Sequence, residues 1–108
     1  MTAKPVIPRQ KARADIDAAL DFYVREAGPA VGLRIIDALE SAFDSISRRP
    51  ATGSPRYAHD LDLPGLRCRP LKRYPFLVFY LERADHIDVW RVLHAHRDIP
   101  SWLQEPGS

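Results

Sequence analysis

Ile87-Asp-Val-Trp-Arg-Val-Leu-His-Ala-His-Arg-Asp98, near the end of the chain, is the segment around which the rest of the sequence is organised. Its first part is typical of a strand, because apolar residues recur from Ile87 to Ala95. Four side chains that can bind phosphate or move protons follow within seven positions, namely Arg91, His94, His96 and Arg97. The segment is therefore a candidate for catalysis, for binding a partner, or for purely structural contacts.

The composition predicts one domain. A chain of 108 residues with 45% hydrophobic residues can bury a core, which we place within residues 5–103 of a single domain spanning 1–108. Its one cysteine, Cys68, excludes an intramolecular disulfide, and no Cys/His set predicts a metal site or another cofactor. The charged start and the lack of any apolar run of roughly 18 residues predict a cytoplasmic protein outside the membrane.

The first half of the chain predicts two helices. From Lys11 to Ala27, apolar residues recur at spacings of three and four, which is typical of an amphipathic helix. Gly28-Pro29 suits the end of one helix and the start of the next, which we expect to run from Ala30 to Arg48. Because the connection is so short, the two helices should form an antiparallel hairpin.

The remaining segments predict strands. We expect a short strand at Pro5–Pro8, and three further strands at Leu66–Arg69, Phe76–Leu81 and Ile87–Ala95, of which Phe76–Leu81 should be central in a meander. About fifteen residues after Pro50 are expected to lack regular structure. The resulting fold class is α+β, with the order β-α-α-β-β-β: an antiparallel helix hairpin packed on one face of a mainly antiparallel sheet of three or four strands.

Positive charge is concentrated in the second half of the chain. The net charge is only +2, but between Leu66 and Tyr80 there are four basic residues and no acidic one: Arg67, Arg69, Lys72 and Arg73. Basic side chains on strands favour an acidic partner, which is either nucleic acid or an acidic protein segment. The alternative is that they are solvated cations on an open sheet face.

The order of the elements and four local motifs resemble the ParE-type toxins of the RelE/ParE superfamily, the toxic halves of bacterial type II toxin–antitoxin operons. The motifs are Pro50-x-x-Gly53, Gly65-Leu-Arg67 at the turn into a strand, Tyr74-Pro-Phe-Leu-Val-Phe-Tyr80, and Arg91-Val-Leu-His-Ala-His-Arg-Asp98. The resemblance extends from Val6 to Leu103 and implies the superfamily's fold, with roles in plasmid stabilisation or the stress response.

The resemblance implies one of two mechanisms. RelE-like members are ribosome-dependent messenger-RNA endonucleases, whereas ParE-like members inhibit DNA gyrase by binding to it. Both kinds are neutralised by an antitoxin, and for this chain the resemblance implies a ParD-like antitoxin with a ribbon-helix-helix part that binds DNA. The toxin would then contact DNA only through its antitoxin.

An endonuclease would need a general base, a general acid and cations around the phosphate. His94 and His96 could serve as base and acid, since residues two apart on a strand project from the same face. The phosphate could be held by four arginines: Arg67, Arg69, Arg91 and Arg97.

A binding inhibitor needs none of this chemistry. Arg91 and His94 match the ParE pattern and are expected to be largely structural, whereas His96 keeps the nuclease open. For gyrase binding we expect contacts from the end of the last strand and the tail: Arg91, His96, Arg97 and Trp102. We therefore predict a gyrase-binding toxin, with a messenger-RNA endonuclease or a non-toxic interaction module as alternatives.

The antitoxin is expected to fill an apolar groove and to pair with an exposed strand edge. The predicted groove residues are Tyr23, Phe43, Leu77, Phe79 and Trp90. Acidic antitoxin side chains would be attracted by Arg67, Arg69, Lys72 and Arg73.

Overall fold

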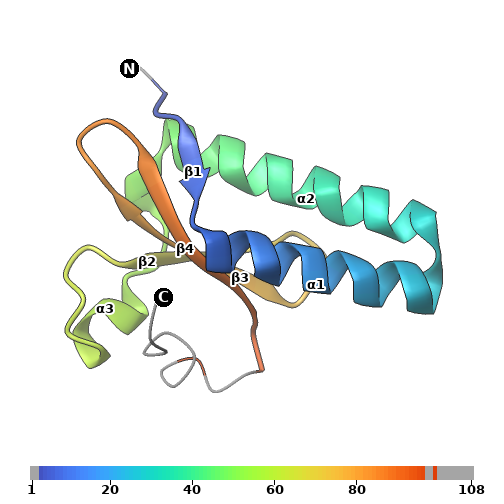
Figure 1. Ribbon diagram of the computed structural model, residues 1–108. Helices are drawn as coiled ribbons and strands as arrows, with labels where there is room; N and C mark the ends of the chain where they lie inside the picture. Colours follow the sequence, from blue (N-terminus) through green and yellow to red (C-terminus); the bar gives the residue numbers. More distant parts are fainter. Residues whose placement is uncertain (1–2, 97–98, 100–108) are drawn as a thin grey trace.

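The computed structural model describes residues 3–96 and residue 99, and Figure 1 shows the order of its elements. They are β1 (Val6–Pro8), α1 (Gln10–Ala27), α2 (Pro29–Arg48), the 3₁₀ helix η1 (Pro50–Thr52), α3 (Arg56–Asp60), β2 (Arg67–Pro70), β3 (Phe76–Glu82) and β4 (Ile87–His94). Within the described residues, no helix combines the length and the apolar character needed to cross a bilayer.

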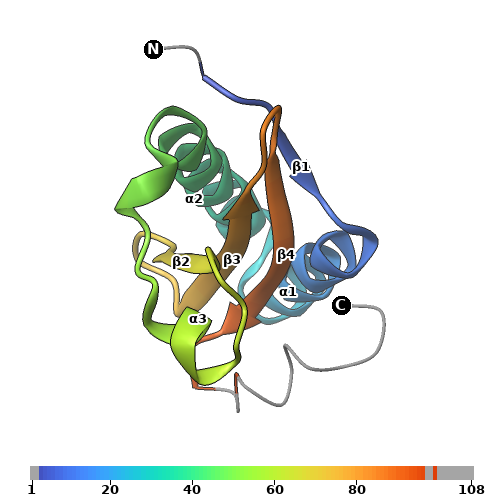
Figure 2. The same ribbon diagram turned by 90° about the vertical axis from the view of Figure 1, so that its left-hand side faces the viewer.

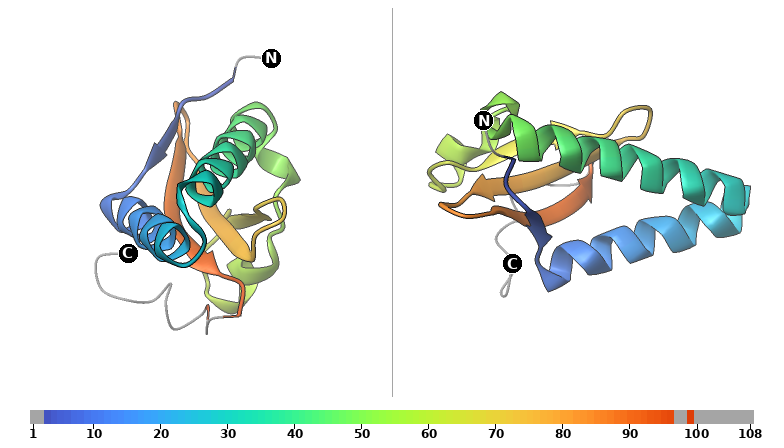
Figure 3. Two further views of the ribbon diagram at one scale, coloured as in Figure 1. Left: turned by 90° about the vertical axis from the view of Figure 1, so that its right-hand side faces the viewer. Right: turned by 90° about the horizontal axis from the view of Figure 1, so that it is seen from above.

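Helices α1 and α2 form the predicted antiparallel hairpin, which extends beyond the sheet in the right-hand view of Figure 3. Gly28 joins them with a φ of 93°, a left-handed conformation that favours glycine, and Pro29 opens α2. Gly32 allows the helices to approach closely, because a Cβ atom there would lie 2.7 Å from a methyl group of Val24. The sequence features at the turn therefore set both the direction and the spacing of the hairpin.

The four strands form one mixed sheet with the order β1-β4-β3-β2. β3 pairs with β2 and β4 in antiparallel fashion, which confirms its predicted place at the centre of the meander, and β1 pairs with β4 in parallel. The pairing of β3 with β4 shifts at one point: Tyr80 lies opposite Val89 and Phe79 opposite Arg91, so Trp90 is an extra residue in β4. The predicted α+β fold is confirmed.

Side chains from both faces of the sheet are buried. The helix hairpin covers one face, where Ile35 and Ile46 of α2 pack with Val78 and Tyr80 of β3. Figure 2 shows α3 on the opposite side of the sheet from the hairpin. A smaller buried cluster lies on that side and includes Leu66, Phe79, Leu93 and Ile99.

Regular structure is present in the segment after Pro50 that we expected to be irregular, and that expectation is wrong. η1 and α3 span three and five residues, which is too short to produce a helical period in the sequence. The Tyr80 hydroxyl holds η1 in place by donating to the Pro50 carbonyl at 2.6 Å and accepting from the Gly53 N–H at 3.1 Å. Burial raises the pKa of Tyr80, so the hydroxyl remains protonated and can donate.

Neither edge of the sheet offers a long row of free backbone groups. On β2, the Cys68 N–H and carbonyl bond to Ser54 at 2.9 and 2.8 Å, and the strand ends at Pro70, which has no N–H. The opposite edge, β1, has three residues, includes Pro8 and follows Pro5. The exposed edge that we expected an antitoxin to extend is therefore blunted at both sides.

Removing the Tyr80 hydroxyl tests how η1 is held. We expect Tyr80→Phe to lower the free energy of unfolding by about 1–3 kcal/mol, because it leaves the buried Gly53 N–H without an acceptor. Urea denaturation measures this difference. Tyr74→Phe is the matched control, because the Tyr74 hydroxyl makes no hydrogen bond within the described residues. Equal stability of the two variants would contradict the role of Tyr80.

Candidate functional site

Arg91 lies on β4 with a side chain only 4% exposed. Its Nε and Nη2 atoms donate to the two carboxylate oxygens of Asp15 on α1, each at 2.8 Å. The backbone N–H of Val92 donates to the same carboxylate at 3.0 Å. This bidentate pair ties α1 to β4, and it leaves Arg91 no exposed face for the phosphate or the target that the sequence suggested.

His94 and His96 lie close together, but not through the predicted strand spacing, because β4 ends at His94 and His96 lies in the turn that follows. Their ring centroids are 5.2 Å apart, and the backbone N–H of His96 donates to Nδ1 of His94 at 3.2 Å. Because Nδ1 accepts this hydrogen bond, neutral His94 carries its proton on Nε2. His94 is half-buried against the edge of Phe76, whereas His96 is exposed. The other predicted residues of this end, Arg97 and Trp102, lie outside the described residues.

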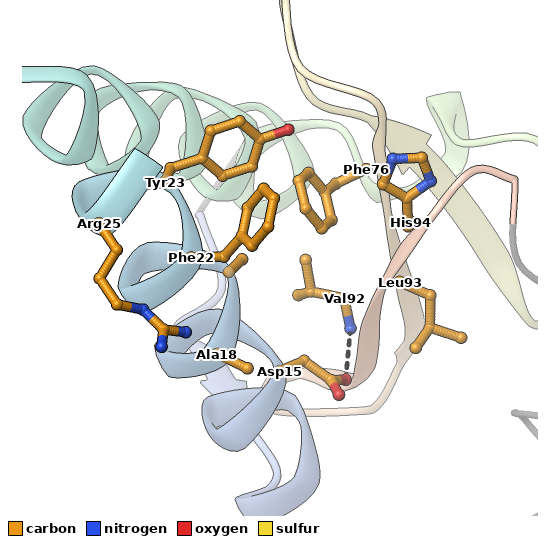
Figure 4. A pocket seen from close by; sticks show the side chains of 10 residues that line it. Asp15, Ala18, Phe22, Tyr23, Arg25, Phe76, Val92, Leu93 and His94 are labelled. Atoms are coloured by element: carbon orange, nitrogen blue, oxygen red, sulfur yellow. Dashed lines mark hydrogen bonds between the residues drawn. The ribbon is translucent and has the colours of Figure 1, made fainter. Parts of the chain in front are cut away.

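A groove of about 540 Å³ opens beside this histidine pair, between α1 and the neighbouring ends of β3 and β4. Figure 4 shows Phe22 and Tyr23 of α1 pointing toward Phe76, with the Asp15–Val92 hydrogen bond at the base of the groove. The lining consists mainly of apolar side chains: Asp15, Ala18, Ala19, Phe22, Tyr23, Arg25, Phe76, Val92, Leu93 and His94. Phe22 is 52% exposed, so the groove presents an aromatic ring to solvent.

The five residues predicted to form one antitoxin groove do not lie together. Tyr23 and Phe43 pack on the helix side of the sheet, whereas Leu77, Phe79 and Trp90 belong to the cluster on the other side. Phe79 is fully buried and cannot contact a partner without unfolding of its surroundings. Of the five, only Tyr23 lines the groove. Alternation along a strand cannot tell which of two covered faces a residue occupies, and this explains the error.

Sequence reasoning missed Phe22, the most exposed aromatic residue of the groove. It lies outside the helical stripe that includes Ile16, Leu20 and Tyr23, which pack against the buried core. A large apolar residue on the polar face of an amphipathic helix is the signal that could have identified it.

The four basic residues between Leu66 and Tyr80 also divide into two pairs. Arg67 donates to the Gly53 carbonyl at 2.7 Å, and Arg69 donates to the Thr52 hydroxyl at 3.2 Å, so both fasten the segment around η1 to β2. Lys72 and Arg73 are exposed on the turn between β2 and β3. Only this second pair remains available to an acidic partner.

A second ionic cluster fixes the start of α1 to β4. Asp88 accepts hydrogen bonds from Arg9 at 2.9 and 3.0 Å and from Arg83 at 3.0 and 3.2 Å. The Arg9 guanidinium also lies over the Trp90 ring, 4.4 Å from its centroid. Burial pushes the pKa of Asp88 upward, but the hydrogen bonds from both arginines outweigh burial and hold the pKa below its usual value.

The part of the chain that the structure describes contains no candidate metal site. No cluster of three or more His, Cys, Asp or Glu side chains there could hold a metal ion. What the site presents is an apolar groove, a histidine pair and a buried ion pair.

Comparison with known proteins shows to which family the chain belongs. The family described as "ParE toxin of type II toxin-antitoxin system, parDE" matches residues 6–99. The chain belongs to the ParE toxin family. A solved structure titled "Chromosomal ParDE TA system from P. aeruginosa" superposes on the chain with a TM-score of 0.72. That likeness covers 87% of this chain and 98% of the other at 24% identity, and it concerns the fold. No curated protein sequence matches the chain.

Breaking the pair between Asp15 and Arg91 should be costly in this ParE-family chain. We expect Arg91→Gln to lower the free energy of unfolding by about 3 kcal/mol, because the largely buried Asp15 carboxylate loses its cation. Arg91→Lys keeps the charge but not the bidentate geometry, so its free energy of unfolding should lie between those of the wild type and Arg91→Gln. Chemical denaturation measures both, with Arg48→Gln at an exposed ion pair as the control.

The ion pairs of Asp88 predict a pH dependence of stability. Because its folded pKa is lowered, its contribution is present above the unfolded pKa of about 3.9 and is lost as the pH falls through the folded pKa. Asp88→Asn should therefore cost about 1 kcal/mol at pH 7 and progressively less below about pH 4. Denaturation at several pH values tests this, and Asp44→Asn, at an exposed pair, should change little. A difference that persists at pH 2 would rule out the ionic origin.

Proposed function

We propose that this ParE-family chain is the toxin of a type II pair, that a ParD-like antitoxin neutralises it, and that it inhibits DNA gyrase by binding. We favour binding over hydrolysis because the Arg91 side chain is buried and bound to Asp15. Both of its donating edges toward Asp15 are occupied, in a position nearly closed to solvent. A cleavage site needs cations at the scissile phosphate, and Arg91 is not free to serve as one of them.

The groove between α1 and β4 is the proposed seat of the antitoxin. A half-exposed Phe22 beside Tyr23 and Phe76 offers an apolar slot for side chains of a partner. The blunted edges at β2 and β1 provide little template for an added strand. We therefore infer that the antitoxin docks its apolar side chains into the groove, as an amphipathic helix does, and does not extend the sheet.

The exposed end of β4 is the proposed contact with gyrase. His96 is exposed there and lies next to the groove through its contact with His94. An antitoxin in the groove would therefore cover part of this end. Such overlap would explain neutralisation as a competition between antitoxin and target for adjoining surfaces.

The proximity of the two imidazoles favours one alternative, a ribosome-dependent messenger-RNA endonuclease. Rings 5.2 Å apart could exchange roles as base and acid around a bound RNA. In this alternative the phosphate would have to be held by cations other than Arg91, and the ribosome would supply the remaining contacts.

Expression of the chain alone in a bacterium separates the two mechanisms. Gyrase inhibition predicts growth arrest with double-strand DNA breaks and an SOS response, and purified chain should trap cleaved plasmid with gyrase. Gyrase inhibition also predicts intact messages, both with the wild-type chain and with a His94→Ala, His96→Ala double variant, because binding requires no proton transfer by the imidazoles. Translation arrest with cut messages, abolished in the double variant, would establish the endonuclease. Normal growth would remove the toxin assignment and favour a non-toxic interaction module.

Phe22 provides a direct test of the groove. We expect Phe22→Ala to weaken binding of the antitoxin by about tenfold or more, because exposed aromatic residues in apolar slots dominate interface energy. Thermal stability should change little, since the ring is 52% exposed in the free chain. Leu33→Ala removes an even more exposed apolar side chain outside the groove and is the matched control. Equal affinities for both variants, measured by calorimetry, would move the antitoxin to another surface.

A further inference from the structure

A second pocket, of about 240 Å³, lies between α2 and the turn that connects β2 to β3. Three cations line it, Arg34 from α2 and the adjacent Lys72 and Arg73 from the turn, and all three are exposed. Asp37 also lines the pocket but makes no ion pair with any of them. Three positive charges and one negative charge therefore line a small hollow, and no ion pair joins them.

The lack of partners at this pocket is unusual for the chain. Among the lysines and arginines that the structure describes, only Arg34, Arg49, Lys72 and Arg73 make no side-chain hydrogen bond, ion pair or ring contact. Three of these four line the pocket. Arg73 also has a φ of 74°, a left-handed conformation that costs a non-glycine residue free energy, so the fold alone gives no reason for an arginine there.

The pocket adjoins the apolar groove through two aromatic rings. Tyr74 lines the pocket, Tyr23 lines the groove, and their ring centroids lie 6.1 Å apart in an edge-to-face contact. A peptide that fills the groove with apolar side chains can therefore reach the three cations within a short stretch of chain. The two surfaces together fit an amphipathic partner with acidic residues beside its apolar ones.

We propose that the pocket formed by Arg34, Lys72 and Arg73 binds carboxylates of an acidic peptide segment, and that this segment belongs to the antitoxin whose apolar side chains occupy the groove. The identity of the peptide rests on the function proposed above. A nucleic acid fits the pocket less well, because a phosphate backbone needs an extended basic track. Here Asp37 stands within the lining, and the neighbouring turn of α2 carries Glu40.

The test compares a triple variant, Arg34→Gln with Lys72→Gln and Arg73→Gly, with a control, Arg49→Gln. The control removes the one unpartnered cation of the described residues that lies outside the pocket. We expect the triple variant to bind the ParD-type antitoxin about tenfold or more weakly and with a smaller dependence on salt. Its melting temperature should not fall, because glycine accepts the φ of residue 73 without strain. The control should bind as the wild type does. Unchanged affinity of the triple variant would overturn the proposal.

A second experiment needs no antitoxin and so separates this proposal from the proposed function. The backbone amide signals of residues 34, 72 and 73, which are present in both the wild type and the triple variant, are followed by NMR while a hexaglutamate peptide or a single-stranded RNA hexamer is added. Shifts with hexaglutamate at lower concentrations than with RNA, lost in the triple variant, support the carboxylate pocket. A stronger response to RNA, or no response to hexaglutamate, would overturn it. If the wild-type chain binds hexaglutamate but not the antitoxin, the proposed function fails and the pocket stands.

Discussion

The buried pair between Asp15 and Arg91 is the constraint on which the packing of α1 against the sheet depends. α2 carries five buried residues and adheres to the sheet through apolar contact, whereas Ala12 is the only buried residue of α1. Ile16, Leu20 and Tyr23 of α1 also pack against the core but are only partly buried, so α1 has a weaker apolar contact than α2. The bidentate hydrogen bonds from Arg91, and the hydrogen bond from the Val92 N–H to the same carboxylate, fix the position of α1 on β4.

This constraint changes what the last strand can do. A guanidinium that has left water must keep its carboxylate, so Arg91 cannot turn toward a substrate without breaking the junction of α1 and β4. The same junction forms the base of the apolar groove, because Asp15 and Val92 both line it. Arg91 and Asp15 thus hold the walls of this groove in place. This supports the proposal that the chain acts by binding and not by hydrolysis.

Features that depend on local periodicity could be predicted from the sequence, and features that depend on long-range pairing could not. The helix hairpin, the turn at Gly28 and the central place of β3 all follow from local spacing. Asp15 lies 76 residues before its partner, and nothing in a single sequence connects them. The extra residue Trp90 shifts the β3–β4 register at that point of β4, so simple alternation could not place the side chains beyond it. Arg67 and Arg69 appeared available because their acceptors, Gly53 and Thr52, belong to a segment that seemed irregular.

The distribution of partners among the cations gives the strongest physical argument about which surfaces serve function. A charge that bonds within the chain, as Arg9 does with Asp88, contributes to the fold and is constrained by it. A charge without a bond contributes little to stability, so its position is free to follow the needs of binding. Arg34 and Lys72 are of this second kind, and Tyr74 links their pocket to the groove around Tyr23. The fold therefore separates a paired ionic framework at β4 from a surface whose cations make no bond within the described residues, and this second surface is the one proposed to bind a partner.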